Sequence, residues 1–324
     1  MKAIVYREYG PPEVLKLEEM EKPTTKDKEV LIAVRAAGVN PLDWHFLRGL
    51  PYPVRLLTGF RKPKDPRFGV DVAGEVVAVG SDVRELRAGD AVFGTCRGAF
   101  AEYACALEAT LTRKPENVTF EEVAAVPIAG LTALQSLRDK GRVETGHRVL
   151  VNGAAGGVGT FAVQIAKSFG SEVIGVCSTR NVEMVRSIGA DRVVDYTRED
   201  FTNSGQRWDV ILDCVSNHSL AVYARCMTAE GRYVALGWLD GGGRWMMGAL
   251  KDGLVGSVLS LRGGQKFLSM FARINNPDLA TLAELLKTGR VKPVIDRCYR
   301  LSEALEAIRY LEQLHAQGKV LIRP

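Results

Sequence analysis

The chain has 324 residues, enough for two domains that each bury a core, so small disulfide-stapled scaffolds are excluded. With 46% hydrophobic and 25% charged residues and no repeat or low-complexity tract, the composition is that of a globular protein rather than a disordered or solenoid one. The net charge of +5 is spread along the chain and lacks the dense basic patch that nucleic-acid binding requires.

The cysteines and the apolar stretches give expectations about location. Six cysteines without a Cys-x-x-Cys pair signal neither a zinc knuckle nor a disulfide framework, and reduced thiols favour a cytoplasmic setting. The first residues alternate like a strand and lack the apolar core of a secretory signal. The longest nonpolar region, 245–261, is interrupted by Lys251 and Asp252 and is too short to cross a bilayer, so we expect no membrane span.

The first third of the chain alternates short apolar stretches with Gly and Pro, which predicts an all-β block. The expected strands are 2–6, 30–39, 71–79, 91–94 and 99–105. Residues 48–68 are rich in proline, which removes backbone donors, so we expect no regular helix or central strand there. This stretch is predicted to be a mobile loop beside a cleft.

From about residue 120 strands and helices alternate, which is the pattern of βαβ units. The expected elements are a helix 120–139, a strand 148–152, a helix 157–169, a strand 172–176, a helix 182–188, strands 192–194 and 209–213, a helix 219–226 and a strand 232–236. Uninterrupted apolar runs are typical of parallel strands covered on both faces. The predicted fold class is therefore α/β, with a doubly wound parallel sheet.

The C-terminal tail is too short to form a core of its own. Its expected elements are a helix 278–287, an extended segment 293–299, a helix 302–315 and a strand 319–323. We therefore assign the tail to the N-terminal block, so that residues 1–122 and 263–324 form a β-rich domain. Residues 123–262 then form an inserted nucleotide-binding domain, and the cleft between the two is the expected site.

The strongest local signal is a glycine-rich turn between the strand 148–152 and the helix that follows it. The glycines are spaced Gly153-x-x-Gly156-x-x-Gly159. Glycine lets the chain turn sharply and lets backbone amides approach a pyrophosphate, and the helix N-terminus adds a partial positive charge. Tight packing alone is the other interpretation, but the surrounding βαβ units favour a dinucleotide site.

The end of the next strand indicates which dinucleotide binds. An NAD site usually has Asp or Glu there, for the ribose 2′-hydroxyl. This chain instead has Ser178, Thr179 and Arg180, with no acid before Glu183. Hydroxyls and a guanidinium suit a 2′-phosphate, so the sequence favours NADPH, although Arg180 would also be ordinary as a solvated cation at a helix start.

Five stretches, taken together and in their order along the chain, resemble the medium-chain dehydrogenase/reductase superfamily, and within it the zinc-independent quinone oxidoreductase and enone reductase branch. They are Gly38-Val39-Asn40-Pro41-Leu42-Asp43-Trp44, Gly69-Val70-Asp71-Val72-Ala73-Gly74-Glu75-Val76, Val126-Pro127-Ile128-Ala129-Gly130-Leu131-Thr132-Ala133, the glycine turn, and Ser187-Ile188-Gly189-Ala190-Asp191. The resemblance covers essentially the whole chain. It implies that the β-rich domain is a GroES-like catalytic domain and that the inserted domain is a Rossmann domain.

The chain departs from the zinc-dependent alcohol dehydrogenases of that superfamily. Asn40 stands where those enzymes have a zinc-binding cysteine, and Gly69-Val70-Asp71 stands where they have Gly-His-Glu. The four-cysteine loop of the structural zinc is missing as well, because only Cys96 and Cys105 lie in that region. We therefore expect no bound metal.

The resemblance implies a reductase that transfers hydride from NADPH to a quinone or to the activated C=C bond of an α,β-unsaturated carbonyl. Without a Lewis acid to lower the pKa of an alcohol, alcohol oxidation is disfavoured. The cofactor-binding residues implied are Asn40, Thr132, Gly156, Gly157, Val158, Ser178, Thr179, Arg180, Tyr196, Cys214 and Gly237. The implied catalytic residues are Asn40, near the nicotinamide, and Tyr52 and His45 as candidate proton donors, although water is an alternative donor and both side chains have ordinary structural interpretations.

Two other functions remain open on the sequence alone. One is a zinc-type alcohol dehydrogenase with an altered metal site, and the other is a non-catalytic NADPH-binding interaction protein. The resemblance also implies a homodimer, in which the stretch 255–261 pairs as an exposed sheet edge with its copy. No nucleic-acid or membrane partner is expected.

Overall fold

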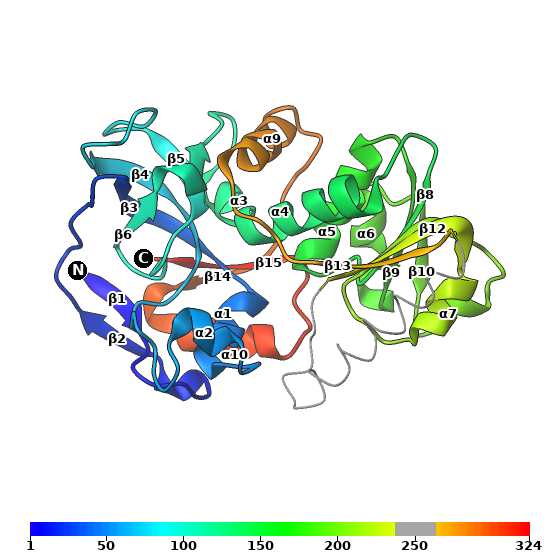
Figure 1. Ribbon diagram of the computed structural model, residues 1–324, viewed down its shortest axis with the longest axis horizontal. Coiled ribbons are helices and arrows are strands. Elements are labelled where there is room, and N and C mark those ends of the chain that lie inside the picture. Colours follow the sequence, from blue (N-terminus) through cyan, green and yellow to red (C-terminus); the bar gives the residue numbers. More distant parts are fainter. Residues whose placement is uncertain (237–263) are drawn as a thin grey trace. The chain divides into compact units, whose positions relative to one another are not determined.

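The computed structural model describes residues 1–236 and 264–324, and its chain divides into two compact units (Figure 1). The first unit comprises Met1–Leu131, Ile274–Gly289 and Pro293–Pro324, and the second comprises Thr132–Arg273 and Arg290–Lys292. The main part of the second unit, Thr132–Arg273, therefore begins and ends about ten residues later in the chain than the sequence-based boundaries at 122 and 263. Gly237 and the predicted edge strand 255–261 lie outside the described residues.

A mixed sheet forms the framework of the first unit. Its strands run in the order β14-β15-β3-β4-β5-β7, β6 pairs with β3, and β1 and β2 form a separate antiparallel pair. Their bounds are β1 Lys2–Val5, β2 Lys16–Glu19, β3 Glu29–Val39, β4 Asp71–Val79, β5 Ala91–Thr95, β6 Tyr103–Leu107, β7 Leu111–Arg113, β14 Ile295–Arg300 and β15 Lys319–Arg323. The C-terminal strand β15 lies antiparallel to β3, with Val320 opposite Val39, so the end of the chain completes the N-terminal sheet.

Helices cover this sheet and begin where the sequence supplies a start signal. They are α1 Pro41–Arg48, α2 Val54–Thr58, α3 Phe120–Ala124, α4 Pro127–Gln135, α9 Asn276–Lys287 and α10 Ala304–Glu312, with the short 3-10 turns η1 Pro12–Val14, η2 Glu108–Thr110 and η6 Leu301–Glu303. Helix α10 buries Ala304, Ala307 and Ile308 in the core of the first unit. The division between the units falls inside α4.

Two sequence predictions about helices were wrong. The proline-rich stretch 48–68 contains the helix α2, because Pro53 precedes the first helical turn, where a missing backbone donor costs nothing. The single helix expected over 120–139 is broken into α3, α4 and a π-helical turn, η3 Ser136–Gly141. Thr119 caps α3 by accepting from the amide of Glu122, and Pro127 begins a new helix.

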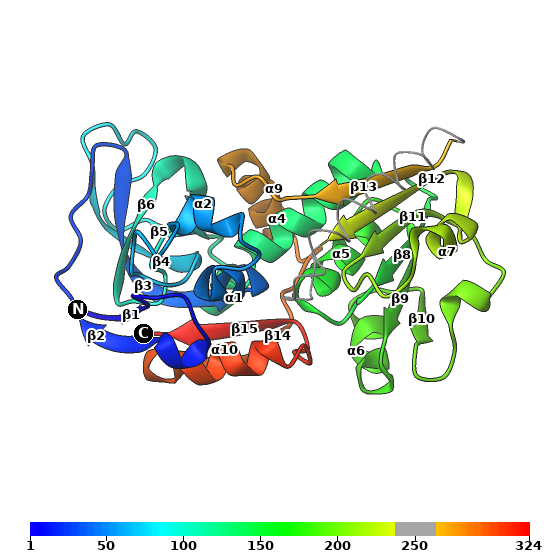
Figure 2. The same ribbon diagram turned by 60° about the horizontal axis from the view of Figure 1, so that its bottom comes forward.

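The second unit contains the parallel sheet that the apolar runs predicted. Its strands run in the order β10-β9-β8-β11-β12-β13, the arrangement typical of dinucleotide-binding sheets, and Figure 2 shows them side by side. The strands are β8 Arg148–Asn152, β9 Glu172–Cys177, β10 Arg192–Asp195, β11 Trp208–Asp213, β12 Met227–Leu236 and β13 Lys266–Met270. The helices are α5 Gly157–Ser168, α6 Val182–Ser187 and α7 Leu220–Arg225, with the 3-10 turns η4 Thr179–Asn181 and η5 Phe201–Asn203.

Sequence-based bounds in this unit agree with the structure to within a residue or two at most ends. The exceptions are β12, which begins well before the predicted residue 232, and β13, which the sequence did not predict. Only Met270 of β13 is buried, so the strand has little of the apolar pattern that marks the others. It pairs in parallel with β12 and keeps this segment in the second unit.

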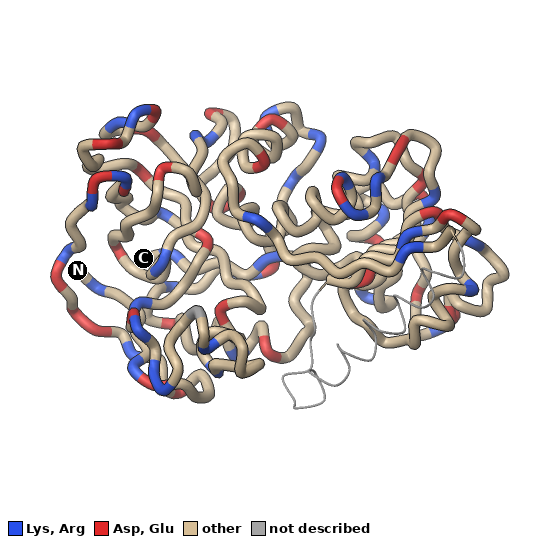
Figure 3. The backbone as a smooth tube through the Cα atoms, in the orientation of Figure 1, with Lys and Arg blue, Asp and Glu red and all other residues tan. Residues whose placement is uncertain are grey.

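Charged residues of both signs are interspersed along the described parts of both units (Figure 3). This agrees with the small net charge spread along the chain. None of the helices in the described residues is long and apolar enough to cross a membrane.

Candidate functional site

The glycine turn of the second unit connects β8 to α5, and the three glycines of its spaced motif, Gly153, Gly156 and Gly159, have separate roles. Gly153 has a φ of +85°, and its amide donates to the carbonyl oxygen of Val176 at 3.2 Å, which ties the turn to β9. A Cβ at Gly159 would lie 2.1 Å from the carbonyl oxygen of Gly153, so no side chain fits there. At Gly156 the only atom of the described residues within 4 Å of such a Cβ is that same oxygen, at 3.5 Å, so a ligand can approach this position.

Helix α5 begins directly behind Gly156, which is its N-cap. The first intrahelical bond is made by the amide of Thr160, which donates to the carbonyl oxygen of Gly156 at 3.0 Å. The preceding amides, including those of Gly157 and Val158, therefore have no partner within the helix. Together with the helix dipole they form the kind of site that binds a phosphate group.

The predicted phosphate-selecting residues come together at the ends of β9 and β10. The amide of Tyr196 donates to the carbonyl oxygen of Cys177 at 3.0 Å, so Tyr196 lies beside the segment Ser178–Arg180 that follows β9. The side chains of Thr179, Arg180 and Tyr196 are exposed, as a ligand would require. The structure thus gathers these residues at one edge of the sheet, although whether they bind a 2′-phosphate stays a prediction.

An acidic residue that sequence reasoning missed lies in the same cluster. The Thr179 hydroxyl donates to Asp195 Oδ2 at 2.6 Å, and the Thr197 hydroxyl donates to Asp195 Oδ1 at 2.7 Å. These bonds lower the pKa of the Asp195 carboxyl, the one from Thr179 most. The Thr179 hydroxyl therefore bonds to Asp195, and the other predicted phosphate-binding residues in the cluster are Arg180, Ser178 and Tyr196. Asp195 was missed because it ends the neighbouring strand rather than following β9.

Cys214, predicted to border the cofactor, follows β11 in a turn held by a buried carboxylate. Asp213 is fully buried, and its Oδ1 accepts from the amides of Val215 at 3.0 Å and Ser216 at 2.9 Å. The same oxygen accepts from Asn152 Nδ2 at 2.9 Å, and Tyr233 donates its hydroxyl to Asp213 Oδ2 at 2.8 Å. Burial raises the pKa of the Cys214 thiol, so it stays protonated and contributes shape rather than a nucleophile.

In the first unit, Asn40 lies between the end of β3 and the start of α1, with its side chain buried. Its Nδ2 donates to Asp71 Oδ2 at 2.8 Å, and its Oδ1 accepts from Lys319 Nζ at 2.5 Å. Lys319 also lies 3.4 Å from Asp71 Oδ2, and both side chains are buried. The side-chain amide predicted to face the nicotinamide therefore bonds within the protein, and no sequence motif indicated that Lys319 would take part.

Asp43 is a second buried carboxylate next to this network. Its Oδ2 accepts from the backbone amide of Asn40 at 2.8 Å, while its Oδ1 has no hydrogen-bond partner in the part of the chain that the structure describes. Burial, and then repulsion from Asp71, raise the pKa of Asp43 to about 8. A carboxyl with such a pKa keeps its proton at neutral pH.

The two predicted proton donors differ in their surroundings. His45 Nδ1 lies 2.9 Å from the carbonyl oxygen of Leu50, which can only accept, so the ring proton belongs on Nδ1. Burial lowers the pKa of His45, which keeps the ring neutral and leaves Nε2 as an acceptor. Tyr52 is 69% exposed and retains a hydroxyl that a ligand can reach. The geometry favours Tyr52 over His45 as a donor.

Thr132, the remaining predicted cofactor residue, lies in α4 and is half-buried. It is the first residue of the second unit.

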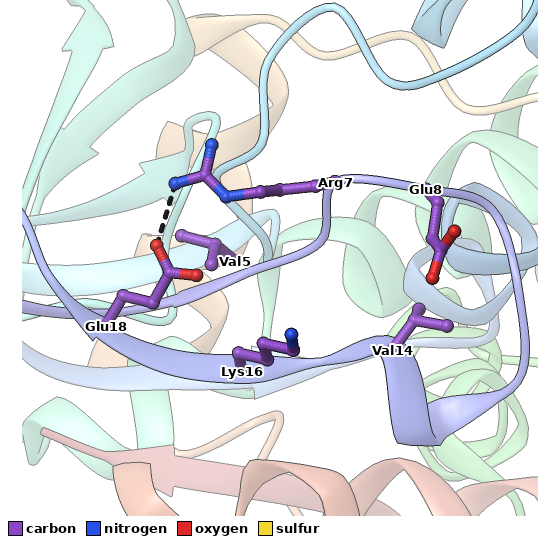
Figure 4. A pocket seen from close by; sticks show the side chains of 6 residues that line it. All are labelled: Val5, Arg7, Glu8, Val14, Lys16 and Glu18. Carbon is purple, nitrogen blue, oxygen red and sulfur yellow. Dashed lines mark hydrogen bonds and ion pairs between the residues drawn. The ribbon is translucent and has the colours of Figure 1, made fainter.

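A hollow at β1 and β2 is unrelated to these clusters (Figure 4). Arg7 donates to Glu18 at 2.8 Å across it, and both side chains are partly exposed. The hollow contains none of the predicted site residues. A second hollow is lined by Thr179 and Asp195 and so adjoins the cluster at the ends of β9 and β10.

The residues at the positions of the zinc ligands do not fit a zinc ion. Zinc is held by Cys, His and carboxylate groups in tetrahedral geometry. Here Asn40 stands at the position of the cysteine ligand, and its Oδ1 already accepts from the ammonium of Lys319, while Val70, at the position of the His of Gly-His-Glu, has no atom that can bind a metal. Among residues 1–236 and 264–324, no three His, Cys, Asp or Glu side chains are grouped so that they could hold a metal.

Comparisons with known proteins cover the whole chain. Residues 26–116 match the family model described as "Alcohol dehydrogenase GroES-like domain", and residues 188–322 match "Zinc-binding dehydrogenase". The chain is 33% identical over 339 residues to the chloroplast envelope quinone oxidoreductase homolog of Arabidopsis thaliana, covering 100% of this chain and 98% of that one. It is 34% identical over 343 residues to the NADPH-dependent alkenal/one oxidoreductase of the same plant, with 100% and 80% covered.

A solved structure is similar over its full length as well. The quinone oxidoreductase from Coxiella burnetii superposes with a TM-score of 0.85 at 32% identity, covering 100% of this chain and 99% of that one. The sequence relatives and this structure agree on one fold and one class of protein.

Proposed function

We propose, from the premise that this chain belongs to the zinc-independent quinone oxidoreductase and enone reductase branch of the medium-chain dehydrogenase/reductase superfamily, that it is an NADPH-dependent reductase. Its acceptor is a quinone or the activated C=C bond of an α,β-unsaturated carbonyl. Relatives named for each of these activities match the whole chain. The alcohol dehydrogenase alternative is disfavoured because Asn40, at the position of the zinc-binding cysteine, binds Lys319, and Val70, at the position of the His of Gly-His-Glu, offers no ligand atom.

The observation that carries the proposal is the turn at Gly156. Strand β8 leads into the turn, and Gly156 leaves space beside the first amides of α5. The cluster of Ser178, Arg180 and Tyr196 lies at the ends of β9 and β10. This is the arrangement that binds a pyrophosphate and then a 2′-phosphate. When bound, the dinucleotide supplies the hydride.

The chain's own residues bind and orient the cofactor and donate a proton. The amides of Gly157 and Val158 hold the pyrophosphate, and Arg180 donates to the 2′-phosphate as a planar fork. Cys214 borders the cofactor through a turn that Asp213 keeps rigid. Tyr52 donates the proton that the reduced acceptor needs, and water replaces it when it is absent. Hydride transfer places negative charge on the carbonyl oxygen of the acceptor, and hydrogen-bond donors that already face this oxygen stabilise that charge.

A direct test mixes the protein with NADPH and a panel of small quinones and enones and follows the loss of nicotinamide absorbance. Turnover of at least one class is expected. A protein that binds NADPH and reduces nothing in the panel would instead be a non-catalytic nucleotide-binding protein, and the proposal would fail. The same panel with NADH tests the choice of cofactor.

Replacing Arg180 with Ala tests the phosphate site. Removing a hydrogen bond from a charged donor should raise the KM for NADPH about tenfold while changing that for NADH little. Arg35→Ala is the matched control, because Arg35 is exposed on β3 of the first unit and pairs with Glu75 at 3.1 Å. Equal changes for both dinucleotides would remove Arg180 from the phosphate site.

Location and assembly are also part of the proposal. Six free cysteines are compatible with a reducing compartment, and we place the protein in the cytoplasm. We propose a homodimer formed through the sheet edge at 255–261, which lies outside the described residues. Light scattering on the purified protein tests the dimer, and a monomer at micromolar concentration would contradict it.

A further inference from the structure

Lys319 is a buried cation that neither the sequence motifs nor the cofactor site accounts for. Among the described residues it is the only buried lysine or arginine, with its side chain 3% exposed. It begins β15, directly after Gly318, whose φ is +86° and whose Cβ, if present, would lie 2.2 Å from the carbonyl oxygen of Val294. The backbone amide of Lys319 donates to that same oxygen at 2.8 Å. The residue is thus fixed where its side chain enters the core.

The ammonium has a full set of partners. Nζ donates to the carbonyl oxygen of Val39 at 3.2 Å, to Asn40 Oδ1 at 2.5 Å and to Asp71 Oδ2 at 3.4 Å. An ammonium has three donors, and each of these acceptors takes one. Two of the partners belong to the junction of β3 and α1, and the third begins β4.

Asp71 extends the network to a further helix. Its Oδ1 accepts from the backbone amide of Ile128 at 3.1 Å, in the first turn of α4. Its Oδ2 accepts from Asn40 and Lys319. The surroundings are closely packed, because a Cβ at Gly38 would lie 3.0 Å from this oxygen and 2.4 Å from the carbonyl oxygen of Ala124. One carboxylate therefore connects the starts of α1 and α4 and depends on one cation for its charge balance.

The ammonium of Lys319 lies among residues that align with the zinc site of the zinc-dependent relatives. Asn40 and Asp71 stand at positions where the zinc-dependent relatives have a zinc-binding cysteine and the Glu of Gly-His-Glu. In this chain the cation among these residues is a lysine side chain supplied by the last strand. An ammonium cannot accept an electron pair from the substrate as a metal does, so its contribution is to hold its neighbours in place.

We propose that Lys319 is a positioning residue for hydride transfer, whose ammonium orders Asn40 and Asp71 and, through them, the starts of α1 and α4. The inference rests on the proposed reductase function and adds to it. Helix α1 carries His45 and leads to Tyr52, and α4 carries Thr132. Hydride transfer requires reacting atoms about 3–3.5 Å apart, so displacement of these elements lowers kcat about 10²-fold per ångström.

The test uses three variants of the full chain. Lys319→Met removes the ammonium and leaves Asp71 buried without its cation. The double variant Lys319→Met with Asp71→Asn removes both charges, so no unpaired charge remains buried. Lys287→Met is the matched control, because Lys287 is exposed at the end of α9.

Activity and thermal stability are measured for each. Lys319→Met should lower kcat at least about tenfold while the Kd for NADPH, measured by nicotinamide fluorescence, changes less than about threefold. Its Tm should fall, and the double variant should recover much of that Tm without recovering kcat. Recovery of kcat together with Tm would mean that the pair serves stability alone and would overturn the proposal. So would a kcat for Lys319→Met equal to that of Lys287→Met.

A second measurement separates this inference from the proposed function. Amide hydrogen exchange at residues 38–48 and 126–131 should be faster in Lys319→Met and remain faster in the double variant, because both lack the ammonium that orders these segments. Exchange at the wild-type rate in the double variant would overturn the inference. If the wild-type protein reduces no quinone or enone, the proposed function fails, whereas the exchange result still decides whether Lys319 orders the two helix starts.

Discussion

Asp71 in the first unit and Asp213 in the second are both completely buried, but their charges are balanced in different ways. Asp71 faces the ammonium of Lys319, one side-chain amide and one backbone amide. Within residues 1–236 and 264–324, Asp213 pairs with no cation and accepts from two backbone amides, the amide of Asn152 and the hydroxyl of Tyr233. The first arrangement ties elements distant in sequence, and the second fixes a local turn.

The two carboxylates should therefore respond differently to the loss of one partner. A carboxylate that accepts from several neutral donors keeps most of its hydrogen bonds when one donor is removed. An ion pair loses its balance at once when either charge is removed. The network at Lys319 should therefore be the more fragile of the two, and variants of each carboxylate test this directly.

Asp71→Asn should have the largest effect. It leaves the Lys319 ammonium buried without a carboxylate, which costs about 3–5 kcal/mol of unfolding free energy. Urea unfolding measures the change. Glu75→Gln is the control, because the exposed pair of Glu75 with Arg35 is worth about 1 kcal/mol or less. Similar losses for the two variants would contradict the assignment of Asp71 to a buried ion pair.

Asp213→Asn should cost less. The substitution keeps the shape but places an NH₂ group against donors, so about 1–3 kcal/mol is lost through the unsatisfied partners. The Kd for NADPH should rise as well, because the turn bearing Cys214 loses its anchors. A loss larger than that of Asp71→Asn, in the same urea titration, would reverse the comparison between the two carboxylates.

The pH dependence of stability sharpens the comparison for Asp43, the other buried acid beside Asp71. The pKa of its carboxyl is 3.8 when exposed to water and about 8 in the folded chain. Between these two pH values the folded chain therefore holds this proton while the unfolded chain has lost it. The resulting stability is complete below the unfolded pKa and is lost as pH rises toward the folded pKa, by at most about 1.4 kcal/mol per pH unit.

Asp43→Asn stays neutral at every pH and should therefore show a shallower decline in unfolding free energy between about pH 5 and 7. Urea titrations of both proteins at several pH values measure the two slopes. Burial also raises the pKa of Asp71, although Lys319 opposes this, so some slope should remain in the variant. Parallel curves would show that Asp43 is ionised in the folded chain.

Tyr223→Phe should have the smallest effect. The Tyr223 hydroxyl lies 3.4 Å from Asn152 Nδ2 and 3.3 Å from Asn217 Oδ1, which are long bonds, so about 0.5–1 kcal/mol should be lost. Tyr233→Phe removes the 2.8 Å bond to Asp213 and should cost more. Thermal denaturation of the two variants side by side gives the order, and a larger loss for Tyr223→Phe would contradict this description of the network.

The sequence predicted the second unit well, for physical reasons. Apolar runs covered on both faces and a glycine turn between a strand and a helix leave few alternatives, and this sheet is present in the order expected of dinucleotide-binding folds. Ser178, Arg180 and Tyr196 lie at the same edge of this sheet because two adjacent parallel strands, β9 and β10, end together, and their role in binding stays a prediction. Asp195 was missed because its contact with Thr179 crosses from one strand to the next.

The first unit was harder to predict, and Lys319 shows why. The strand 319–323 was predicted at its exact bounds, yet a lysine at the start of a strand ordinarily faces solvent. Its partners, Asn40 and Asp71, are more than two hundred residues away, so no local spacing signals the contact. Helix α2 was missed for a different reason, since prolines that exclude a helix interior are tolerated at its start.

The close approach of Gly159 to the carbonyl oxygen of Gly153 limits which substitutions the coenzyme-binding turn can accept. Any side chain at position 159 would push the whole of α5 away from β8 and turn its leading amides from their target. Variation that alters coenzyme preference must therefore accumulate elsewhere, in the exposed positions after β9 and β10, where a mutation changes charge without moving a helix. Libraries built to convert the protein to a different dinucleotide should begin at 178–180 and 195–198.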